Sequence, residues 1–316
     1  MSTEFILGFV LAMVCAIFWA GLDISRKKLG RQMTATGAVA GLMLLHLVYL
    51  NPLLMTGSFV DGEGPLFEMV LPGYPEVPAA YFLPTLLSIS LNLAANFLFL
   101  RAVQISPLSL TTPYLAFTPV FTAVTALIFL GQVPTTVGAI GIVIVCLGAF
   151  FMNPGNSDDG PLAPLKALWT ERGSFYMIIV ALIWSITPIL DKTASDLTNP
   201  IWHTMILAAG VGLIFLVFRG VRDRSISPLI KEFKIMPWWL AVAGLLAVGA
   251  MAFQLTSYAF IDVAYVETVK RAVGVTAAIA AGYFFFGERD IWRRLLGALV
   301  MSAGVAMILF AGGGAG

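Results

Sequence analysis

The sequence predicts an all-α integral membrane protein with ten transmembrane helices, arranged as two inverted repeats of five helices. Three observations predict this fold class: an apolar composition, long runs without charged side chains, and an internal duplication. The 316 residues are 59% hydrophobic and 11% charged, whereas soluble domains carry roughly 25% charged residues. The net charge of +1 gives no reason to expect nucleic acid as a partner.

The charge-free runs define the helices, because a helix that spans the bilayer needs about 20 mainly apolar residues. The longest run, 102–157, has room for two helices, which we separate at the turn-forming residues 131–134 (GQVP). The predicted spans are 5–23, 34–56, 79–101, 107–130, 134–152, 174–191, 200–218, 237–260, 264–286 and 292–311.

The duplication relates residues 5–152 to residues 175–310. The aligned pairs are Trp19 with Trp184, Lys27 with Lys192, Ala102 with Ala259, and Gly131, Gly141 and Gly148 with Gly287, Gly297 and Gly304. Because five is an odd number, the second copy enters the membrane from the opposite side. Inverted repeats of this kind are typical of secondary transporters with a site near the bilayer midplane.

The basic residues predict the orientation of the chain. Of the 18 lysines and arginines, 15 fall on loops that would share one side of the membrane, and the other three are Lys192, Lys270 and Arg271. By the positive-inside rule, both termini are expected on the non-cytoplasmic side. The longest loop on that side, 57–78, has four carboxylates and no basic residue, and we expect it to form a small ordered cap.

The remaining chemistry-bearing residues predict no cofactor and no enzyme. Cys15 and Cys146 lie inside predicted spans and are expected to be buried, free thiols. His46 and His203 have no carboxylate or cysteine at metal-ligand spacing. The sequence also lacks GxSxG, HExxH and glycine-rich phosphate-loop motifs.

Three segments resemble the drug/metabolite transporter superfamily, of the EamA type with ten helices. They are the first span with Trp19, the proline-rich segment 106–119 (SPLSLTTPYLAFTP), and the final hairpin 282–309 with Gly287-Glu288, to which Gly131-Gln132 corresponds in the first half. The resemblance implies a first EamA-like repeat at 1–156, a linker at 157–173 and a second repeat at 174–316. It also implies secondary transport by alternating access in the cell inner membrane, but no single substrate.

The ninth predicted helix is similar to the same helix of plastid triose-phosphate translocators, whose Lys-Arg pair holds the substrate phosphate. Carried over to this sequence, that pair is Lys270 and Arg271. Glu267, Lys270 and Arg271 share one helix face, which Gly274 and Ala278 continue, so an anion could approach the backbone there. Charged residues inside a spanning helix usually mark a functional site.

Two other interpretations of this triplet stay open. Lys270 and Arg271 could extend to the headgroups while Glu267 pairs with Arg271. Alternatively, Glu267 could carry a coupling proton, kept ionised by Arg271 until substrate competes for that cation.

Further polar residues are candidates to bind substrate, with packing as the alternative role for each. Tyr114 is the repeat equivalent of Arg271, on a fourth helix that also carries Thr111, Thr118, Thr122, Thr125, Pro113 and Pro119. The third helix carries the polar residues Ser88, Asn92 and Asn96, and the eighth carries Gln254, Ser257 and Tyr258, which could hydrogen-bond across a helix seam. Trp19 and Trp184 could stack on substrate or anchor the helices at the interface. Asp191 and Lys192 are expected to form a pair at the mouth.

The expected function is secondary transport of a small organic solute with an anionic or zwitterionic head, bound between helices 1–4 and 6–9. A proton-coupled exporter of amino acids or amines and a flippase for a lipid or lipid-linked phosphate are the alternatives. The expected partners are a small-molecule or lipid-like substrate and membrane lipids. The small residues of 138–148 and 297–314, on helices 5 and 10, suit either a packed scaffold pair or a homodimer face.

Overall fold

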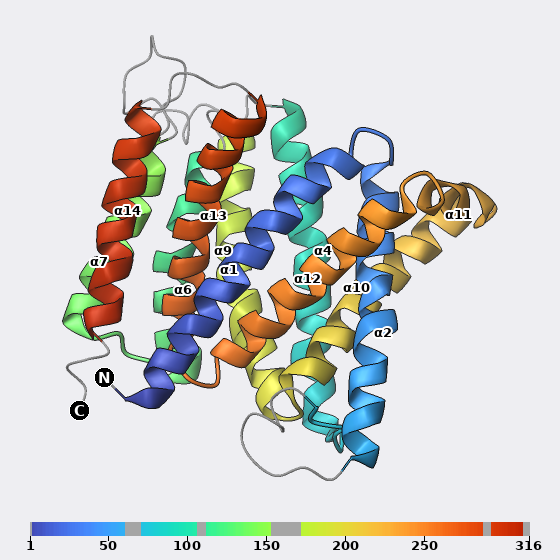
Figure 1. Cartoon of the computed structure of the whole chain (residues 1–316), viewed down its shortest axis with the longest axis horizontal. Coiled ribbons are helices and arrows are strands. Elements are labelled where there is room, and N and C mark those ends of the chain that lie inside the picture. Colours follow the sequence, from blue (N-terminus) through green and yellow to red (C-terminus); the bar gives the residue numbers. More distant parts are fainter. Residues whose placement is uncertain (1, 61–70, 106–111, 153–171, 287–291, 312–316) are drawn as a thin grey trace. The chain divides into compact units, whose positions relative to one another are not determined.

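The computed structural model describes residues 2–60, 71–105, 112–152, 172–286 and 292–311, and all secondary structure in these ranges is helical (Figure 1). The elements are α1 (Thr3–Leu29), α2 (Ala35–Phe59), η1 (Ala79–Tyr81), α4 (Phe82–Ile105), η2 (Thr112–Phe117), α6 (Thr118–Leu130), α7 (Thr136–Met152), α9 (Arg172–Asp196), α10 (Pro200–Arg222), α11 (Ser227–Phe233), α12 (Pro237–Ser257), α13 (Val263–Phe286) and α14 (Trp292–Ala311).

The predicted fold class is confirmed, because within the described residues a helix overlaps every predicted span. Within the described residues, six helices are long and apolar enough to cross a membrane, and shorter apolar helices lie at 114–130, 136–150 and 296–310. The described part of the fourth span starts with the 3-10 turn η2 and becomes α-helical at Thr118. Pro119 explains this start, because proline suits the first turn of a helix, where its missing N–H leaves no bond unmade. The short helix α11 was not predicted.

Local capping explains several helix ends. Thr34 accepts a hydrogen bond from the backbone N–H of Gly37 at the start of α2, and Asn199 accepts one from Trp202 at the start of α10. Gly131 ends α6 in the left-handed region, with φ of 66°, a conformation that glycine adopts without strain. The turn expected at 131–134 is therefore confirmed.

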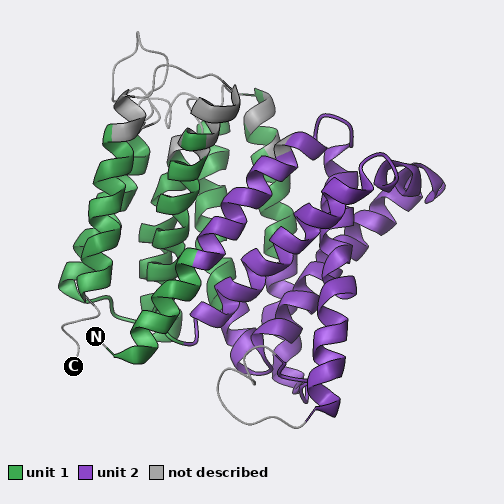
Figure 2. Ribbon diagram, viewed as in Figure 1, with its two compact units in different colours: residues 1–13, 90–190, 260–316 green, residues 14–89, 191–259 purple. Residues whose placement is uncertain are grey.

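The chain forms two compact units (Figure 2). Unit 1 comprises Met1–Met13, Ser90–Leu190 and Phe260–Gly316, and unit 2 comprises Val14–Ile89 and Asp191–Ala259. Each unit takes helices from both halves of the sequence, and α1, α4 and α9 pass from one unit to the other. The repeat boundaries predicted from the sequence therefore do not coincide with the compact units, and they stay a prediction.

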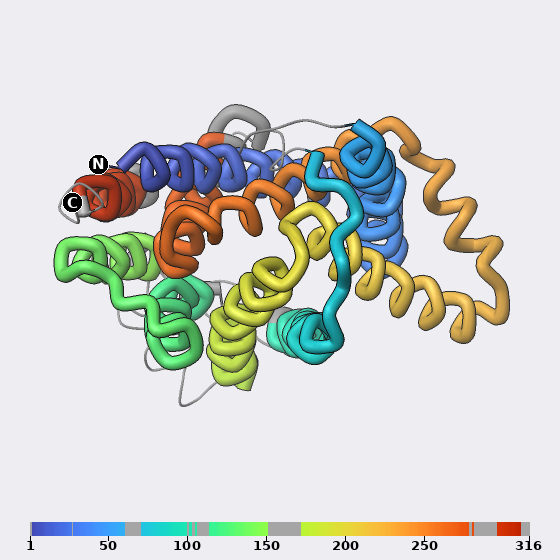
Figure 3. Tube along the Cα trace, turned by 90° about the horizontal axis from the view of Figure 1, so that it is seen from below, coloured from blue at the N-terminus to red at the C-terminus, as the bar shows by residue number. Residues whose placement is uncertain are grey.

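In unit 1, α7 and α14 lie side by side (Figures 1 and 3) and approach closely at glycines. A Cβ atom added to Gly141 would lie 2.7 Å from the carbonyl oxygen of Gly304, and one added to Gly304 would lie 2.7 Å from that of Gly141. Similarly, a Cβ on Gly148 would lie 3.1 Å from the Gly297 oxygen. The small residues thus form a scaffold pair within the chain, and the homodimer through these helices stays a prediction.

In unit 2, α2 packs against α10 and α12. The described end of the predicted cap, 71–78, is bound to this group: the Tyr74 hydroxyl donates to Asn51 Oδ1 at 2.5 Å, and Asn199 Nδ2 donates to the Gly73 carbonyl at 3.3 Å. Residues 61–70 of the cap lie outside the described part of the chain.

Candidate functional site

The charged triplet of α13 contains a buried ion pair. Glu267 is only 5% exposed, and Lys270 Nζ lies 2.6 Å from its Oε2 and 2.7 Å from its Oε1. Lys270 lies three residues after Glu267, on the same helix face, and its long flexible side chain reaches the carboxylate. The pairing of Glu267 with Arg271 that the spacing suggests stays a prediction.

Arg271 is half-buried, and its guanidinium lies close enough to the buried thiol of Cys146 on α7 for an electrostatic interaction. One turn further on, a Cβ added to Gly274 would meet no described atom within 4 Å. The face that carries Arg271 therefore borders open space at Gly274. The side chain of Ala278 lies outside the described residues.

The start of α13 is fixed by the turn after α6. Gln132 Oε1 accepts a hydrogen bond from the backbone N–H of Val263 at 3.1 Å, and the hydroxyl of Tyr265 accepts one from the N–H of Thr135 at 3.0 Å. A Cβ at Gly138 would overlap the Tyr265 ring. The GQVP segment thus holds the helix that carries the triplet, a role that was not predicted.

The polar residues of η2 and α6 are engaged in packing. Tyr114 is fully buried, and its hydroxyl is hydrogen-bonded to Ser174 of α9. The threonine hydroxyls donate to backbone carbonyls: Thr118 to Leu115, Thr122 to Thr118, and Thr125 to Phe121, Thr122 and Ser185 of α9. These bonds favour the packing role of the threonines over ligand binding. Thr111 and the Pro113 side chain lie outside the described part.

Three more predicted residues of unit 1 lie on α4 and α9. The Trp184 ring packs against Phe99, with centroids 6.0 Å apart, in a cluster with Tyr114. Asn96 is exposed and donates from Nδ2 to the Asn92 carbonyl at 2.7 Å. Unit 1 therefore contains seven of the ten predicted substrate-binding residues: Glu267, Lys270, Arg271, Tyr114, Trp184, Asn92 and Asn96.

The other three belong to unit 2 and form one hydrogen-bonded chain. Trp19 Nε1 donates to Gln254 Oε1 at 2.8 Å, and Gln254 Nε2 donates to the Tyr258 hydroxyl at 2.6 Å. This chain joins α1 to the end of α12. The guanidinium of Arg26 lies 5.5 Å from the centroid of the Trp19 ring.

A second buried polar network in unit 2 was missed. Asp191 Oδ1 accepts a hydrogen bond from Ser88 Oγ at 2.5 Å and lies 3.4 Å from His203 Nε2, while His203 Nδ1 lies 3.0 Å from the Tyr81 hydroxyl. The expected pairing of Asp191 with Lys192 is wrong, because Lys192 Nζ lies 2.8 Å from Asp196. The sequence feature that could have indicated this network is the presence of an aspartate, Asp191, and a histidine, His203, in two consecutive apolar spans.

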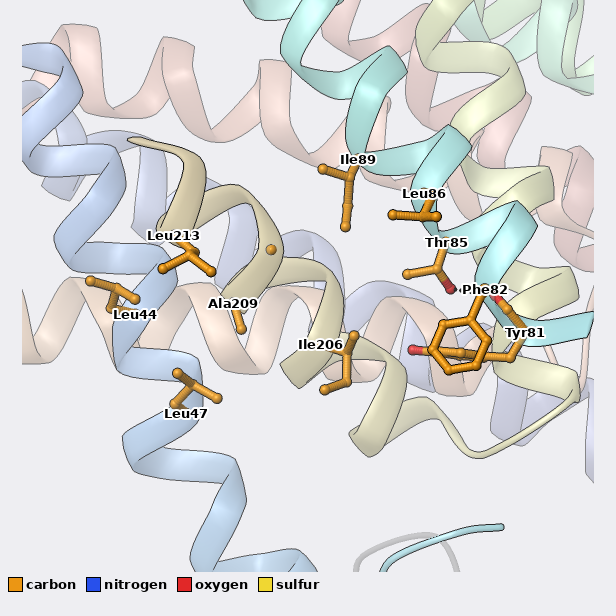
Figure 4. Close-up of a pocket in the computed structure, with 11 residues that line it drawn as sticks. Leu44, Leu47, Tyr81, Phe82, Thr85, Leu86, Ile89, Ile206, Ala209 and Leu213 are labelled. Atoms are coloured by element: carbon orange, nitrogen blue, oxygen red, sulfur yellow. Dashed lines mark hydrogen bonds between the residues drawn. The ribbon is translucent and has the colours of Figure 1, made fainter. Parts of the chain in front are cut away.

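This network borders a cavity of about 310 Å³ in unit 2. The walls come from α2, α10 and the start of α4, and Figure 4 shows Tyr81 and Thr85 together on the wall formed by η1 and α4. All other side chains that line the cavity are apolar.

Comparisons with known proteins agree with this architecture. The profile of the EamA-like transporter family matches residues 6–153 and 171–310. A UPF0060 membrane protein of Arthrobacter sp. (strain FB24) is 33% identical over 109 residues, which are 88% of that protein and 34% of this chain. A solved structure titled only "Crystal structure of protein" superimposes with a TM-score of 0.66 at 13% identity, over 98% of this chain and 99% of the other. At this identity the last match concerns the fold alone.

Proposed function

The chain belongs to the EamA-like transporter family, and from this premise we propose that it is a secondary active carrier for a small organic solute with an anionic or zwitterionic head, moved by alternating access. The observation that supports this proposal is the face of α13 that carries Glu267, Lys270 and Arg271 and opens at Gly274.

The charge on this face favours an anion. One carboxylate and two cations leave a net charge of +1, which an anionic head would neutralise. Arg271 can hold a carboxylate or phosphate through two parallel hydrogen bonds, because its guanidinium is a planar fork. Lys270 would leave its ion pair with Glu267 and bind the incoming anion instead.

Glu267 supports a second candidate, a proton-coupled exporter of amino acids or amines. A zwitterionic amino acid would place its carboxylate on Arg271 and its ammonium on Glu267. When Lys270 turns to the substrate, a carboxylate as buried as Glu267 is stabilised by taking up a proton or a cation. The lipid flippase is a third candidate, which the apolar cavity of unit 2 favours because its lining suits an acyl chain.

We also propose that the protein lies in the inner or plasma membrane with both termini on the non-cytoplasmic side. The support is the distribution of basic residues, 15 of 18 of which fall on loops of one side.

The first test is ligand binding by purified protein. A panel of phosphate esters, amino acids, quaternary amines and lipids is screened by thermal stabilisation, since a ligand at about 100 times its Kd stabilises the folded state by about 2.7 kcal/mol. Arg271→Lys keeps the charge but loses the fork, and we expect binding of the ligand found to weaken by about 1–3 kcal/mol, or roughly 5- to 150-fold in Kd.

Arg222→Lys is the matched control, because the Arg222 side chain is 67% exposed at the end of α10. Wild-type affinity in Arg271→Lys, with the control also unchanged, would contradict the site and favour extension of Arg271 to the headgroups. Uptake of soluble phosphate esters into proteoliposomes, compared with scrambling of headgroup-labelled lipid, separates the solute carrier from the flippase.

A further inference from the structure

We propose that His203 and Asp191 form a proton-binding site in unit 2, in which one proton taken from water neutralises the buried charge of the pair. The proposal rests on the network formed by Tyr81, His203, Asp191 and Ser88. Asp191 is 8% exposed, and the other three residues are almost completely buried.

The hydrogen bonds of the network define its unprotonated state. Ser88 donates to Asp191, so the carboxylate acts as an acceptor. A neutral imidazole with its proton on Nε2 directs that proton toward Asp191 and leaves Nδ1 to accept from the Tyr81 hydroxyl. In this arrangement all the donors face acceptors, and the network carries one negative charge.

Among the described residues, that charge has no cation beside it. Lys192, the next residue, is bound to Asp196, and Arg219 of α10 is bound to Asp223 and Glu232. The titratable groups of α2 are also engaged, because His46 donates to the Leu42 carbonyl and Tyr49 to the Ala241 carbonyl. The helix α12 contains no charged residue or histidine.

An unpaired charge in an apolar interior is costly, and ionisable groups there pair or take up protons. One added proton, either on the second oxygen of Asp191 or on Nδ1 of His203, brings the net charge of the network to zero. In the second case the Tyr81–His203 hydrogen bond reverses, with Nδ1 donating to the phenol oxygen. Tyr81 also lines the cavity of unit 2 (Figure 4). Because the Tyr81 hydroxyl is hydrogen-bonded to His203, which lies beside Asp191, the network extends from the cavity wall to Asp191.

The test uses the fact that the chain contains two histidines. Protein labelled with isotopic histidine is reconstituted in lipid nanodiscs, and the imidazole signals are followed by NMR between about pH 8 and about pH 5. The signal lost in His203→Asn, or retained in His46→Asn, identifies His203. We expect this signal to report a single protonation step in the wild type.

Three variants define the site. In Asp191→Asn the step should disappear from this range, because a proton on His203 would then create a buried positive charge. In Ser88→Ala the step should move to higher pH, because the ionised carboxylate loses a donor. Asp196→Asn is the matched control, because it makes the same substitution at an exposed residue of the same helix. The protonation step reported by His203 should occur at the same pH in this variant as in the wild type.

An unchanging His203 signal in the wild type would overturn the proposal, as would equal titrations of the wild type, Asp191→Asn and Ser88→Ala. Monodispersity in gel filtration confirms folding, and Ser88→Ala keeps the test valid if Asp191→Asn does not fold. The measurement needs no substrate, so its result is independent of the proposed carrier function.

Discussion

Glu267 and Lys270 place an ion pair inside the helix α13, where either charge alone would be far more costly than the pair. Removing one partner of such a pair leaves the other buried and uncompensated. Replacing Lys270 therefore risks the fold as well as the site, which is why Arg271→Lys is the better probe of anion binding.

The coupling role of Glu267 can be tested by Glu267→Gln. If Glu267 carries the coupling proton, this change should abolish gradient-driven accumulation but leave exchange of bound substrate intact, because exchange does not require the empty site to release a proton. Both activities are measured in proteoliposomes with the ligand found by thermal stabilisation.

Glu76→Gln, at an exposed residue of the segment 71–78, is the control. An equal loss of exchange and accumulation in Glu267→Gln would make Glu267 only the structural partner of Lys270. Unchanged accumulation would show that no coupling proton binds there.

At the level of single residues, the sequence identified the charged helix face of α13. Spacing places Glu267 near both Lys270 and Arg271, and the structure adds the direct contact between Glu267 and Lys270. The network of Asp191 and His203 could not be predicted, because it also depends on where η1 and α4 place Tyr81 and Ser88, which lie more than 100 residues earlier in the sequence.

At the level of elements, one cluster joins three helices at the basic end of unit 2. Arg219 of α10 donates to Asp223 and to Glu232 of α11, at 2.8 Å in each case, and to the hydroxyls of Thr34 and Thr36 at 2.6 and 2.9 Å. Glu232 also accepts from the backbone N–H and hydroxyl of Thr34, the residue that caps α2. Burial opposes ionisation of Glu232, but these hydrogen bonds outweigh it and lower its pKa.

This cluster predicts a loss of stability in acid. A carboxyl group whose pKa is lowered by folding stabilises the protein above its ordinary pKa, about 4.3 for glutamate, and loses that contribution as pH falls through its folded value. Glu232→Gln should lower the melting temperature by several degrees at pH 7, a loss of roughly 1–3 kcal/mol for charged hydrogen bonds.

The measurement is thermal unfolding in detergent at pH 7 and at successively lower pH. Between pH 7 and acid pH, the melting temperature of Glu232→Gln should fall by less than that of the wild type. The melting temperature of Glu76→Gln should follow that of the wild type. Equal melting temperatures for Glu232→Gln and the wild type at pH 7 would contradict a stabilising role for the cluster.

The helices themselves were predictable because the chain consists of long, mainly apolar runs separated by short polar or charged segments. The ends of the helices were less predictable. Thr34 and Asn199 are residue types that commonly cap helices, but the 3-10 turn η2 depends on how prolines interrupt the fourth span. The helix α11 is seven residues long in a polar loop, and Arg219 holds it through Glu232. No periodicity in the sequence predicts such a tertiary contact.

At the level of the whole molecule, the duplication is visible in the contacts of α7 and α14. The repeat aligns Gly141 with Gly297 and Gly148 with Gly304, and the observed approaches are Gly141 to Gly304 and Gly148 to Gly297. The repeat operation exchanges these two contacts, as a twofold relation between the helices requires. The match to a UPF0060 protein over 88% of that protein but 34% of this chain agrees, because it shows a relative about as long as one half.

The orientation of the whole molecule is the remaining prediction. The loops proposed to face the cytoplasm contain 15 of the 18 basic residues, and translocating them would be opposed by the positive-inside rule. Exposed positions on the two sides are available at Glu76, in the segment 71–78, and at Ser227, at the start of α11. The two native cysteines are buried, and replacing both by alanine removes background labelling.

In that background, a membrane-impermeant maleimide added to intact cells should label Glu76→Cys and not Ser227→Cys. Inverted vesicles should give the reverse pattern, which serves as the control for reactivity of each cysteine. Labelling of Ser227→Cys from outside the cell would show that both termini face the cytoplasm. The distribution of basic residues would then not decide the orientation of this chain.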